Sequence, residues 1–357
     1  MFPSAGQLVS FVLLGLVLQV SSLNLDDPCT NPYGQAGRCI NFRECQPIVS
    51  IWNKPVVSPE ESQFVQASQC GRGTTGALVC CVGVAAPPKK YTLPKPPHCG
   101  KALEDRIYGG QRTDLDEHPW TALLHYSKPQ GRTGYHCGGS LINSRYVLTA
   151  AHCIQAIPRG WSVIGVRLGE WDLSSTIDCV DDDNNPSTPD FCSDAPVDLG
   201  IDKIIVHENY QSASKAQYDD IALIRLNRDV SFSAFIDPIC LPLERGSTYN
   251  VGSKGWATGF GRTENASSSN LKLKVELEFN DLNKCNGVYK TSGITLRDTQ
   301  LCAGGVRGQD TCSGDSGGPL TRLVKGNNFL YGIVSFGPNK CGTKGVPGVY
   351  TNVAKYT

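Results

Sequence analysis

The stretch Gly314–Asp315–Ser316–Gly317–Gly318–Pro319 decides how this sequence of 357 residues is interpreted. It sets one serine among glycines, where backbone amides can approach a bound group without obstruction from side chains. A serine hydroxyl becomes a good nucleophile only when a neighbouring base takes its proton, and histidine is the usual base near neutral pH. The stretch therefore directs attention to the histidines of the chain and to a carboxylate that could orient one of them.

Two further segments supply these groups. Thr149–Ala150–Ala151–His152–Cys153 offers a histidine, and Tyr218–Asp219–Asp220–Ile221–Ala222–Leu223 offers a carboxylate at the edge of an apolar run. The base needs a buried acceptor that fixes its tautomer, and on the residues alone Asp219 competes with Asp220 for that role. Each segment is weak by itself, since a glycine-flanked serine is usually a turn. Together, in the order His, Asp, Ser, they indicate acyl-transfer chemistry.

The composition indicates an exported protein. Sixteen cysteines follow an apolar run, Leu8–Leu18, and small or polar residues up to Ser22. The run is too short to span a bilayer and predicts a secretory signal peptide over residues 1–22, so that disulfides can form. The formal net charge is +0 without a concentrated basic face, which argues against a nucleic-acid partner. We expect a secreted protein with neither a nucleic-acid nor a membrane partner.

Cysteines and prolines divide the rest of the chain. Residues 23–81 hold six cysteines and no histidine, which favours a small unit stabilised by disulfides over a zinc site. Residues 82–106 are rich in proline and predict an extended linker. Residues 107–357 contain short apolar runs separated by Gly, Pro, Asn and Asp. This pattern favours an all-β sandwich or barrel over a βαβ fold.

With its three segments in this order, the chain from Ile107 onward resembles the chymotrypsin-like (trypsin-type) serine proteases. The resemblance implies two packed six-stranded β-barrels with the site in the cleft between them. In the family the aspartate directly before Ile-Ala-Leu is catalytic, which selects Asp220 as the partner of His152 and Ser316. The backbone amides of Gly314 and Ser316 would form the oxyanion hole.

The same resemblance implies the specificity of the site. Asp310, six residues before Ser316, would lie at the base of the pocket that receives the side chain before the cut bond. A carboxylate in a desolvated pocket needs a cationic partner, so we expect a preference for Arg or Lys. Gly337 and Gly348 match the glycines that keep this pocket open.

Arg106–Ile107–Tyr108–Gly109–Gly110 resembles a family activation site, with Tyr108 as a mild departure. Cleavage after Arg106 would free the ammonium group of Ile107 to pair with Asp315, which orders the pocket and the oxyanion hole. We therefore expect an inactive precursor whose activating protease is itself trypsin-like.

The first unit, which ends in the adjacent pair Cys80–Cys81, resembles the clip domain of arthropod proteases. Spacing alone does not choose among cysteine pairings, but family pairing would join Cys29 with Cys80, Cys39 with Cys70, and Cys45 with Cys81. For the remaining cysteines the resemblance implies Cys99–Cys240, Cys137–Cys153, Cys285–Cys302 and Cys312–Cys341, which leaves Cys179 and Cys192 to pair.

Two surface features are also predicted. The acidic segment from Gly169 resembles the calcium loop of trypsin-like enzymes, with ligands from Glu170, Asp172, Asp178 and a carbonyl near Ser175; a solvated acidic loop is the alternative. Asn265–Ala266–Ser267 is a glycosylation sequon in a Ser-rich stretch, which predicts a surface loop. The chemistry itself requires no cofactor.

Clip-domain proteases act in haemolymph cascades of innate immunity, in prophenoloxidase activation and melanisation or in Toll-ligand processing. The resemblance thus implies protein zymogens as substrates, a serpin as inhibitor and a cofactor that docks on the clip domain. One alternative is a non-catalytic clip-domain cofactor, but such proteins lose the serine that remains here as Ser316. A digestive trypsin would need no clip domain. The family continues beyond Thr357 into a C-terminal helix, so we expect the sequence to be incomplete there.

Overall fold

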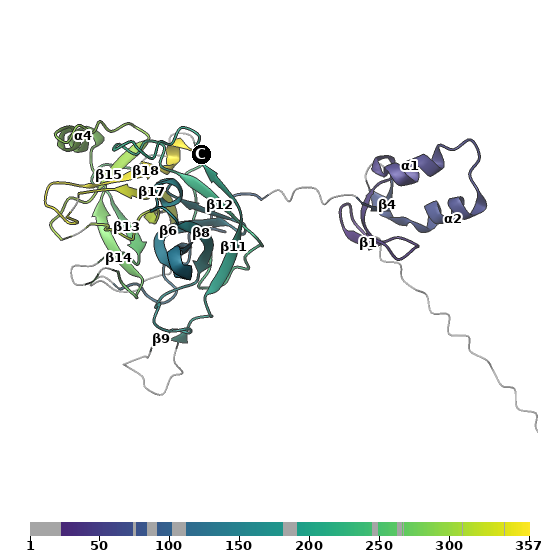
Figure 1. Cartoon of the computed structure of the whole chain (residues 1–357), viewed down its shortest axis with the longest axis horizontal. Coiled ribbons are helices and arrows are strands. Elements are labelled where there is room, and N and C mark those ends of the chain that lie inside the picture. Colours follow the sequence, from purple (N-terminus) through teal and green to yellow (C-terminus); the bar gives the residue numbers. More distant parts are fainter. Residues whose placement is uncertain are drawn as a thin grey trace, which may run out of the picture. The chain divides into compact units, whose positions relative to one another are not determined.

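A computed structural model gives the structure of the chain in two compact units, Met1–Lys90 and Tyr91–Thr357, which Figure 1 draws along the sequence from purple to yellow. The described residues are 23–73, 76–83, 91–101, 112–180, 191–244, 249–262, 266, 268–308, 310–338 and 340–357. No helix within these ranges is long and apolar enough to cross a membrane.

The N-terminal unit is a small antiparallel sheet with two helices. Its strand order is β1-β2-β4-β3. Helix α2 begins with a capping box: the Ser58 hydroxyl accepts from the Glu61 amide at 3.2 Å, and the Glu61 carboxylate accepts from the Ser58 amide at 3.1 Å. The elements are β1 (Pro28–Thr30), β2 (Ala36–Asn41), η1 (Phe42–Glu44), α1 (Gln46–Trp52), α2 (Pro59–Ala67), β3 (Gln69–Gly73) and β4 (Gly76–Val82).

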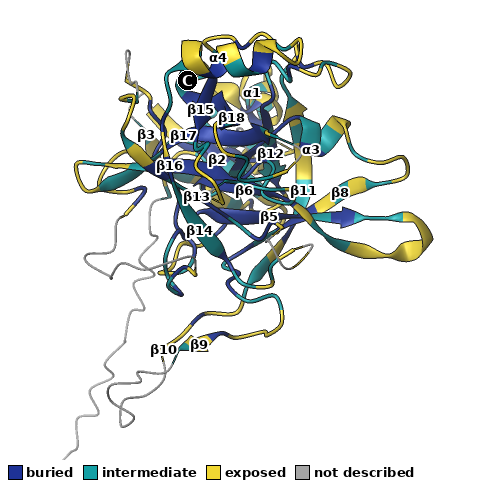
Figure 2. Ribbon diagram, turned by 90° about the vertical axis from the view of Figure 1, so that its left-hand side faces the viewer, coloured by how far each residue is buried: buried dark blue, intermediate teal, exposed yellow. Residues whose placement is uncertain are grey.

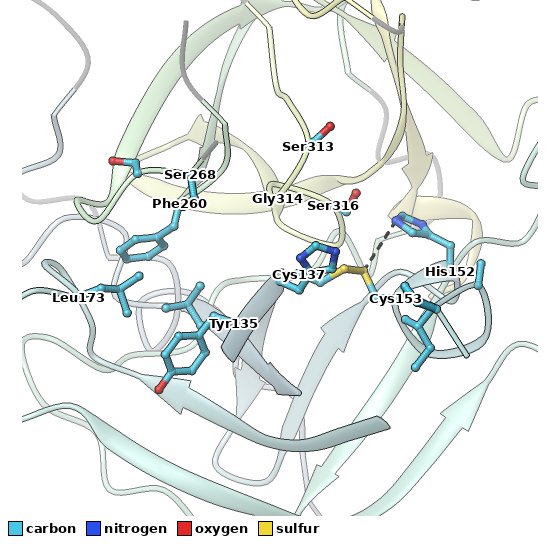
Figure 3. A pocket seen from close by; sticks show the side chains of 16 residues that line it. Tyr135, Cys137, His152, Cys153, Leu173, Phe260, Ser268, Ser313, Gly314 and Ser316 are labelled. Atoms are coloured by element: carbon cyan, nitrogen blue, oxygen red, sulfur yellow. Dashed lines mark hydrogen bonds between the residues drawn. A yellow bond between two sulfur atoms is a disulfide. The ribbon is translucent and has the colours of Figure 1, made fainter. Parts of the chain in front are cut away.

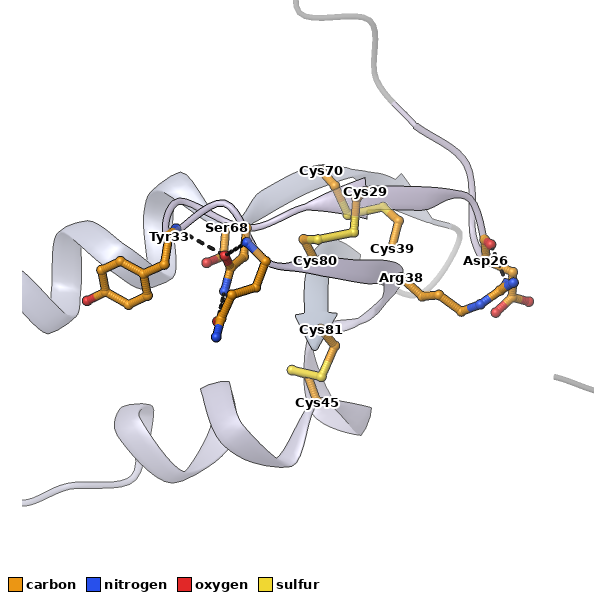
Figure 4. Close-up of a disulfide and its surroundings, with 12 residues drawn as sticks. Asp26, Cys29, Tyr33, Arg38, Cys39, Cys45, Ser68, Cys70, Cys80 and Cys81 are labelled. Carbon is orange, nitrogen blue, oxygen red and sulfur yellow. Dashed lines mark hydrogen bonds between the residues drawn. A yellow bond between two sulfur atoms is a disulfide. The ribbon is translucent and has the colours of Figure 1, made fainter. Parts of the chain in front are cut away.

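The core of this unit is small and depends on disulfides. Ile40 and Val79 of the sheet pack with Ile48 of α1 and Val65 of α2. In Figure 4 Cys29–Cys80 and Cys39–Cys70 lie close together on the sheet, while Cys45–Cys81 fastens the start of α1 to β4. A unit of this size buries little apolar surface, so three disulfides supply stability that the small core cannot.

The C-terminal unit begins with a closed barrel in the order β11-β12-β7-β6-β5-β8. Strand β12 alternates buried and half-buried residues, as expected of a strand with one face on a core. Trp120, Tyr126 and Ile224 fill that core. The elements of this half are β5 (Thr121–Ser127), η2 (Pro129–Gly131), β6 (Thr133–Asn143), β7 (Tyr146–Thr149), α3 (His152–Gln155), β8 (Ser162–Leu168), β9 (Cys179–Val180), β10 (Phe191–Cys192), β11 (Val197–Val206) and β12 (Ala222–Leu226).

A second six-stranded sheet follows in the order β14-β13-β16-β17-β18-β15. Its two edge strands meet in an isolated bridge between Phe279, which directly follows β14, and Ala303, the last residue of β15. This sheet therefore also curls into a barrel. Ile333 of β17 is buried in the core of the first barrel, so the two barrels pack together. The elements are β13 (Lys254–Gly259), β14 (Leu273–Glu278), α4 (Leu282–Lys290), β15 (Gln300–Ala303), β16 (Pro319–Val324), β17 (Asn327–Phe336), β18 (Gly348–Asn352) and η3 (Val353–Lys355).

This architecture confirms the predicted fold class: two β-barrels, preceded by a disulfide-rich unit. Figure 2 shows that β5, β15 and β18 are largely buried, while exposed residues lie in the connecting loops and on outer elements such as α4.

Residues 91–101, which the sequence analysis assigned to the linker, belong to the C-terminal unit. Leu93 packs against the first core, and the Gly100 amide donates to Pro238 O at 2.7 Å. Gly100 has φ +57°, and a Cβ there would lie 2.0 Å from Asn328 O, so only glycine fits this close approach. These contacts explain why a proline-rich segment is held along the barrel.

Candidate active site

His152 and Asp220 are brought together by two paired strands. Strand β7 ends at Thr149, directly opposite Ala222 at the start of β12. The residues just beyond these ends therefore lie side by side. The Asp220 carboxylate accepts from the backbone amide of His152 at 2.8 Å through Oδ1, and its Oδ2 lies 2.8 Å from His152 Nδ1.

Asp220 is fully buried, and the protein satisfies its oxygens. The Ser335 hydroxyl donates to Oδ2 at 2.5 Å, and the Thr351 hydroxyl donates to the backbone carbonyl of Asp220 at 2.7 Å. Asp219 instead accepts a hydrogen bond from Tyr356 at 2.8 Å. Of the two aspartates that the residues left open, Asp220 is the one that contacts His152.

Ser316 comes from the second barrel, in the loop that leads into β16. Its carbonyl accepts from the Gly138 amide of β6 at 2.8 Å, which ties this loop to the first barrel. Gly317 has φ +76°, and a Cβ there would lie 2.3 Å from Thr149 Oγ1. The glycine after the serine is therefore required for the two barrels to approach at this point.

Ser316 and His152 line one cavity of about 470 Å³. Figure 3 shows them near one end of the cavity, with Leu173 and Phe260 at the other. No hydrogen bond joins the Ser316 and His152 side chains among the contacts of the described residues; such bonds often tighten only when substrate binds. Gly314, with φ +104°, lines the same cavity, so both predicted oxyanion-hole residues border it.

Asp310 lies against Gly348, one of the two predicted pocket glycines, and Gly348 in turn lies beside the other, Gly337. A Cβ on Gly348 would lie 3.1 Å from Asp310 Oδ1, and one on Gly337 would lie 3.8 Å from Gly348 Cα. Asp310 Oδ2 accepts from the Gly342 amide at 3.3 Å, whereas Oδ1 is enclosed without a hydrogen-bond partner among the described residues. Burial raises the pKa of Asp310 to about 6, helped by the charge of Asp315. This carboxylate is short of one donor, as a cationic side chain would supply.

The carboxyl group of Asp315 is enclosed although the residue as a whole is partly exposed. A Cβ on Gly259 would lie 2.3 Å from Asp315 Oδ1, and one on Gly261 would lie 2.4 Å from Asp315 Cγ. It accepts from the amides of Gly261 and Cys312, both at 2.9 Å, and burial raises its pKa to about 6. Its predicted partner Ile107, the cleavage site Arg106 and the sequon residue Asn265 lie outside the described residues.

The eight disulfides of the structure join the pairs that the resemblance implied. They are Cys29–Cys80, Cys39–Cys70, Cys45–Cys81, Cys99–Cys240, Cys137–Cys153, Cys179–Cys192, Cys285–Cys302 and Cys312–Cys341. One of them, Cys137–Cys153, borders the site. Cys137 and Cys153 lie beside His152, and because both sulfurs are bonded to each other they cannot serve with it as metal ligands.

The predicted calcium ligands lie in one loop of the first barrel. Glu170 and Asp178 are each only 4% exposed, and their mutual repulsion is one cause that raises the pKa of Glu170, after burial. Asp178 accepts from the Asp172 amide at 3.0 Å and from the Ser175 hydroxyl. Arg167 already pairs with Glu170 at 3.1 Å. The oxygens of both buried carboxylates already accept from protein donors, so calcium would have to displace Arg167 from Glu170 and Ser175 from Asp178, and the calcium site stays a prediction.

We predict that calcium stabilises this protein. At a calcium concentration 100 times Kd, binding to the folded state adds about 2.7 kcal/mol to the free energy of unfolding, which raises Tm by roughly 5–10 °C for a unit of this size. Thermal unfolding with calcium, with magnesium and with a chelator measures this. Glu170→Gln should abolish the calcium effect, and an unchanged Tm under all conditions would exclude the site.

Two residues that support Asp220 escaped the sequence analysis. Ser335 lies two residues before the predicted pocket residue Gly337, and this closeness in sequence could have indicated that Ser335 lies near the site. Thr351 carries no such signal, because its role depends on the pairing of β18 with β17, where it lies opposite Ile333. Side chains that act through tertiary contacts leave little trace in a single sequence.

A double β-barrel with a His–Asp pair from one barrel and a glycine-flanked serine from the other defines the class of trypsin-like serine proteases. The comparisons agree: the trypsin family profile matches residues 107–357, and the regulatory CLIP domain of proteinases matches residues 29–81. The chain belongs to the clip-domain serine proteases.

Relatives match nearly the whole chain. CLIP domain-containing serine protease B4 of Anopheles gambiae is 56% identical over 94% of this chain and 92% of its own. Melanization protease 1 of Drosophila melanogaster is 42% identical over 92% and 90%, respectively. The crystal structure of the Drosophila Grass clip serine protease of the Toll pathway matches with a TM-score of 0.62 and 31% identity, covering 93% of this chain and 96% of that one.

Proposed function

We propose that the chain is the secreted precursor of a trypsin-like serine endopeptidase, activated by cleavage after Arg106. The observation that carries the proposal is the buried Asp220, bonded to His152 through both carboxylate oxygens, with His152 and Ser316 in one cavity. A cofactor without catalysis would have no use for this arrangement. The disulfides support secretion, since they form in oxidising compartments.

The geometry supports acyl transfer in two steps. Ser316 Oγ attacks the substrate carbonyl while His152 takes its proton, and the oxyanion that forms accepts from the amides of Gly314 and Ser316. His152 then gives the proton to the leaving amine. Asp220 accepts a hydrogen bond from His152 Nδ1–H, which leaves Nε2 unprotonated as the base. The Asp220 carboxylate also stabilises the imidazolium that forms. The first step leaves the acyl group on Ser316 Oγ. A water molecule then attacks this ester while His152 takes its proton, and His152 returns the proton to Ser316 Oγ as the carboxylic acid leaves.

Substrates with Arg or Lys before the cut bond fit this site. Asp310 Oδ1 is enclosed and without a donor among its described neighbours, so a guanidinium or ammonium group would complete it. The names of Melanization protease 1 and of the clip serine protease of the Toll pathway support a place in a cascade of melanisation or Toll signalling, and we propose haemolymph as its location. There we propose protein zymogens as substrates, a serpin as inhibitor and a cofactor docked on the clip unit.

The test is activation followed by assay. The purified precursor is cut with immobilised trypsin, the new N-terminus at Ile107 is verified by mass spectrometry, and Arg, Lys and Phe peptide esters are assayed before and after. We expect hydrolysis of the Arg and Lys esters only after cleavage, because Asp315 needs the Ile107 ammonium. Asp315→Asn should be cut but stay inactive.

The matched control is Ser316→Ala, treated in the same way. Equal activity in this variant, or none in the cleaved native chain, would overturn the enzyme assignment and leave the non-catalytic cofactor. Faster hydrolysis of the Phe ester would refute the role of Asp310.

A further inference from the structure

The backbone that carries Asp220 has an unusual conformation. Asp219 has φ +56°, in the left-handed region that aspartate tolerates better than most residues. The Ile221 amide donates to Asp219 O at 2.8 Å, which closes a three-residue turn with Asp220 at its centre. The direction of the Asp220 side chain therefore depends on how firmly Asp219 is held.

Tyr356 holds the side chain of Asp219. Its hydroxyl donates to Asp219 Oδ1 at 2.8 Å, a charge-assisted hydrogen bond. Burial, and then the bond to Asp219, raises the pKa of the Tyr356 phenol, so it remains a donor over the whole working pH range. Nothing in the proposed reaction uses either group.

Tyr356 is itself fixed by its surroundings. Its ring packs against the first core and meets the His207 ring edge-on at 5.3 Å. The preceding residue, Lys355, is bound to Asp298 at 2.7 Å. The ion pair is exposed and adds little, so the packing of the ring is what fixes the hydroxyl that reaches Asp219, as a positioning contact requires.

We propose that Tyr356 is a positioning residue for Asp220, acting through Asp219. It locks the left-handed residue before Asp220, and thereby the carboxylate that orients His152. The inference rests on the proposed function, since it assigns a role within the same triad. Asp219, which competed with Asp220 on sequence grounds, becomes the acceptor by which the fold fixes its neighbour.

The first test removes one hydroxyl. In activated Tyr356→Phe, kcat for a small Arg ester should fall by roughly 10-fold, because a slightly misplaced catalytic group costs rate rather than binding. KM should stay unchanged, since the pocket of Asp310 is untouched. The matched control is Tyr91→Phe, which removes another tyrosine–aspartate hydrogen bond, 2.9 Å to Asp229, in the segment 91–101. This control should keep the native kcat.

The second test separates the hydrogen bond from the backbone. Asp219→Asn keeps an oxygen acceptor and tolerates φ above zero, so it should retain kcat. Asp219→Gly frees the backbone but loses the acceptor, so its kcat should fall by as much as that of Tyr356→Phe. The double variant should have a kcat no lower than that of either single variant. Full activity in Asp219→Gly, or additive losses, would overturn the proposal.

A readout without turnover separates this proposal from the proposed function. The low-field proton resonance of the His152–Asp220 hydrogen bond should broaden in Tyr356→Phe and stay sharp in Tyr91→Phe. If the native enzyme is inactive but the resonance responds in this way, the proposed function fails and the positioning role stands. An unchanged resonance together with unchanged kcat would refute the positioning role while the proposed function remains.

Discussion

Asp220→Asn is expected to lower kcat on Arg esters by on the order of 10⁴-fold, the loss known for this substitution in other proteases of this class. The amide can present an N–H to His152 Nδ1, which forces the proton onto Nε2 and removes the base that Ser316 needs. It also leaves the imidazolium without a negative partner. Single-turnover kinetics on the activated enzyme measures the effect on the chemical step.

The control is the same chemical change one residue earlier. Asp219→Asn should keep native kcat, because Asp219 does not contact His152 and the amide oxygen can still accept from Tyr356. A large loss in Asp219→Asn with little loss in Asp220→Asn would reverse the assignment of the two aspartates. KM should change little in either variant, since neither side chain lines the cavity beside Ser316.

The contrast between Asp219 and Asp220 shows what local sequence can and cannot decide. Both precede the same apolar strand, and hydrophobic pattern alone does not choose between them. The choice depends on the pairing of β12 with β7 and on the left-handed conformation of Asp219, both tertiary facts. Only the family motif supplied the answer in advance.

The strands were predicted to different degrees for physical reasons. Apolar runs such as Ile221–Leu226 and Tyr331–Phe336 mark β12 and β17, because these strands bury most of their residues. Strand β8 has a mixed pattern of exposed and buried residues. Its membership of the barrel is therefore settled by pairing with β5 and β11, which no local pattern reveals.

The linker is another case in which composition predicts only part of the structure. Prolines in 82–106 do exclude regular helix and central strand, and the structure has neither a helix nor a strand in residues 91–101. Yet a chain that cannot form a strand can still pack by single contacts, as Leu93 does against the first core. Cys99, joined to Cys240, then fixes its course along the barrel.

Asp310→Asn is expected to lower kcat/KM for Arg and Lys esters by roughly 30- to 5,000-fold, which corresponds to the 2–5 kcal/mol lost when one partner of a buried charge pair is removed. The amide keeps the size of the side chain, so the Gly342 amide and the walls at Gly337 and Gly348 should be undisturbed. The Phe ester should lose little or even gain. An equal loss on both kinds of ester would indicate damage to the fold rather than to specificity.

The pH dependence gives a sharper form of the same prediction. Because burial raises the pKa of Asp310 to about 6, the free enzyme holds this group largely ionised at pH 7 and largely neutral at pH 5. Only the ionised form attracts a cationic side chain, so KM for an Arg ester should rise about 10-fold from pH 7 to pH 5. KM for a Phe ester should not rise in this way. In Asp310→Asn, KM for the Arg ester should no longer depend on pH over this range. A KM for Arg that is flat through pH 6 in the native enzyme would mean that Asp310 does not bind the substrate cation.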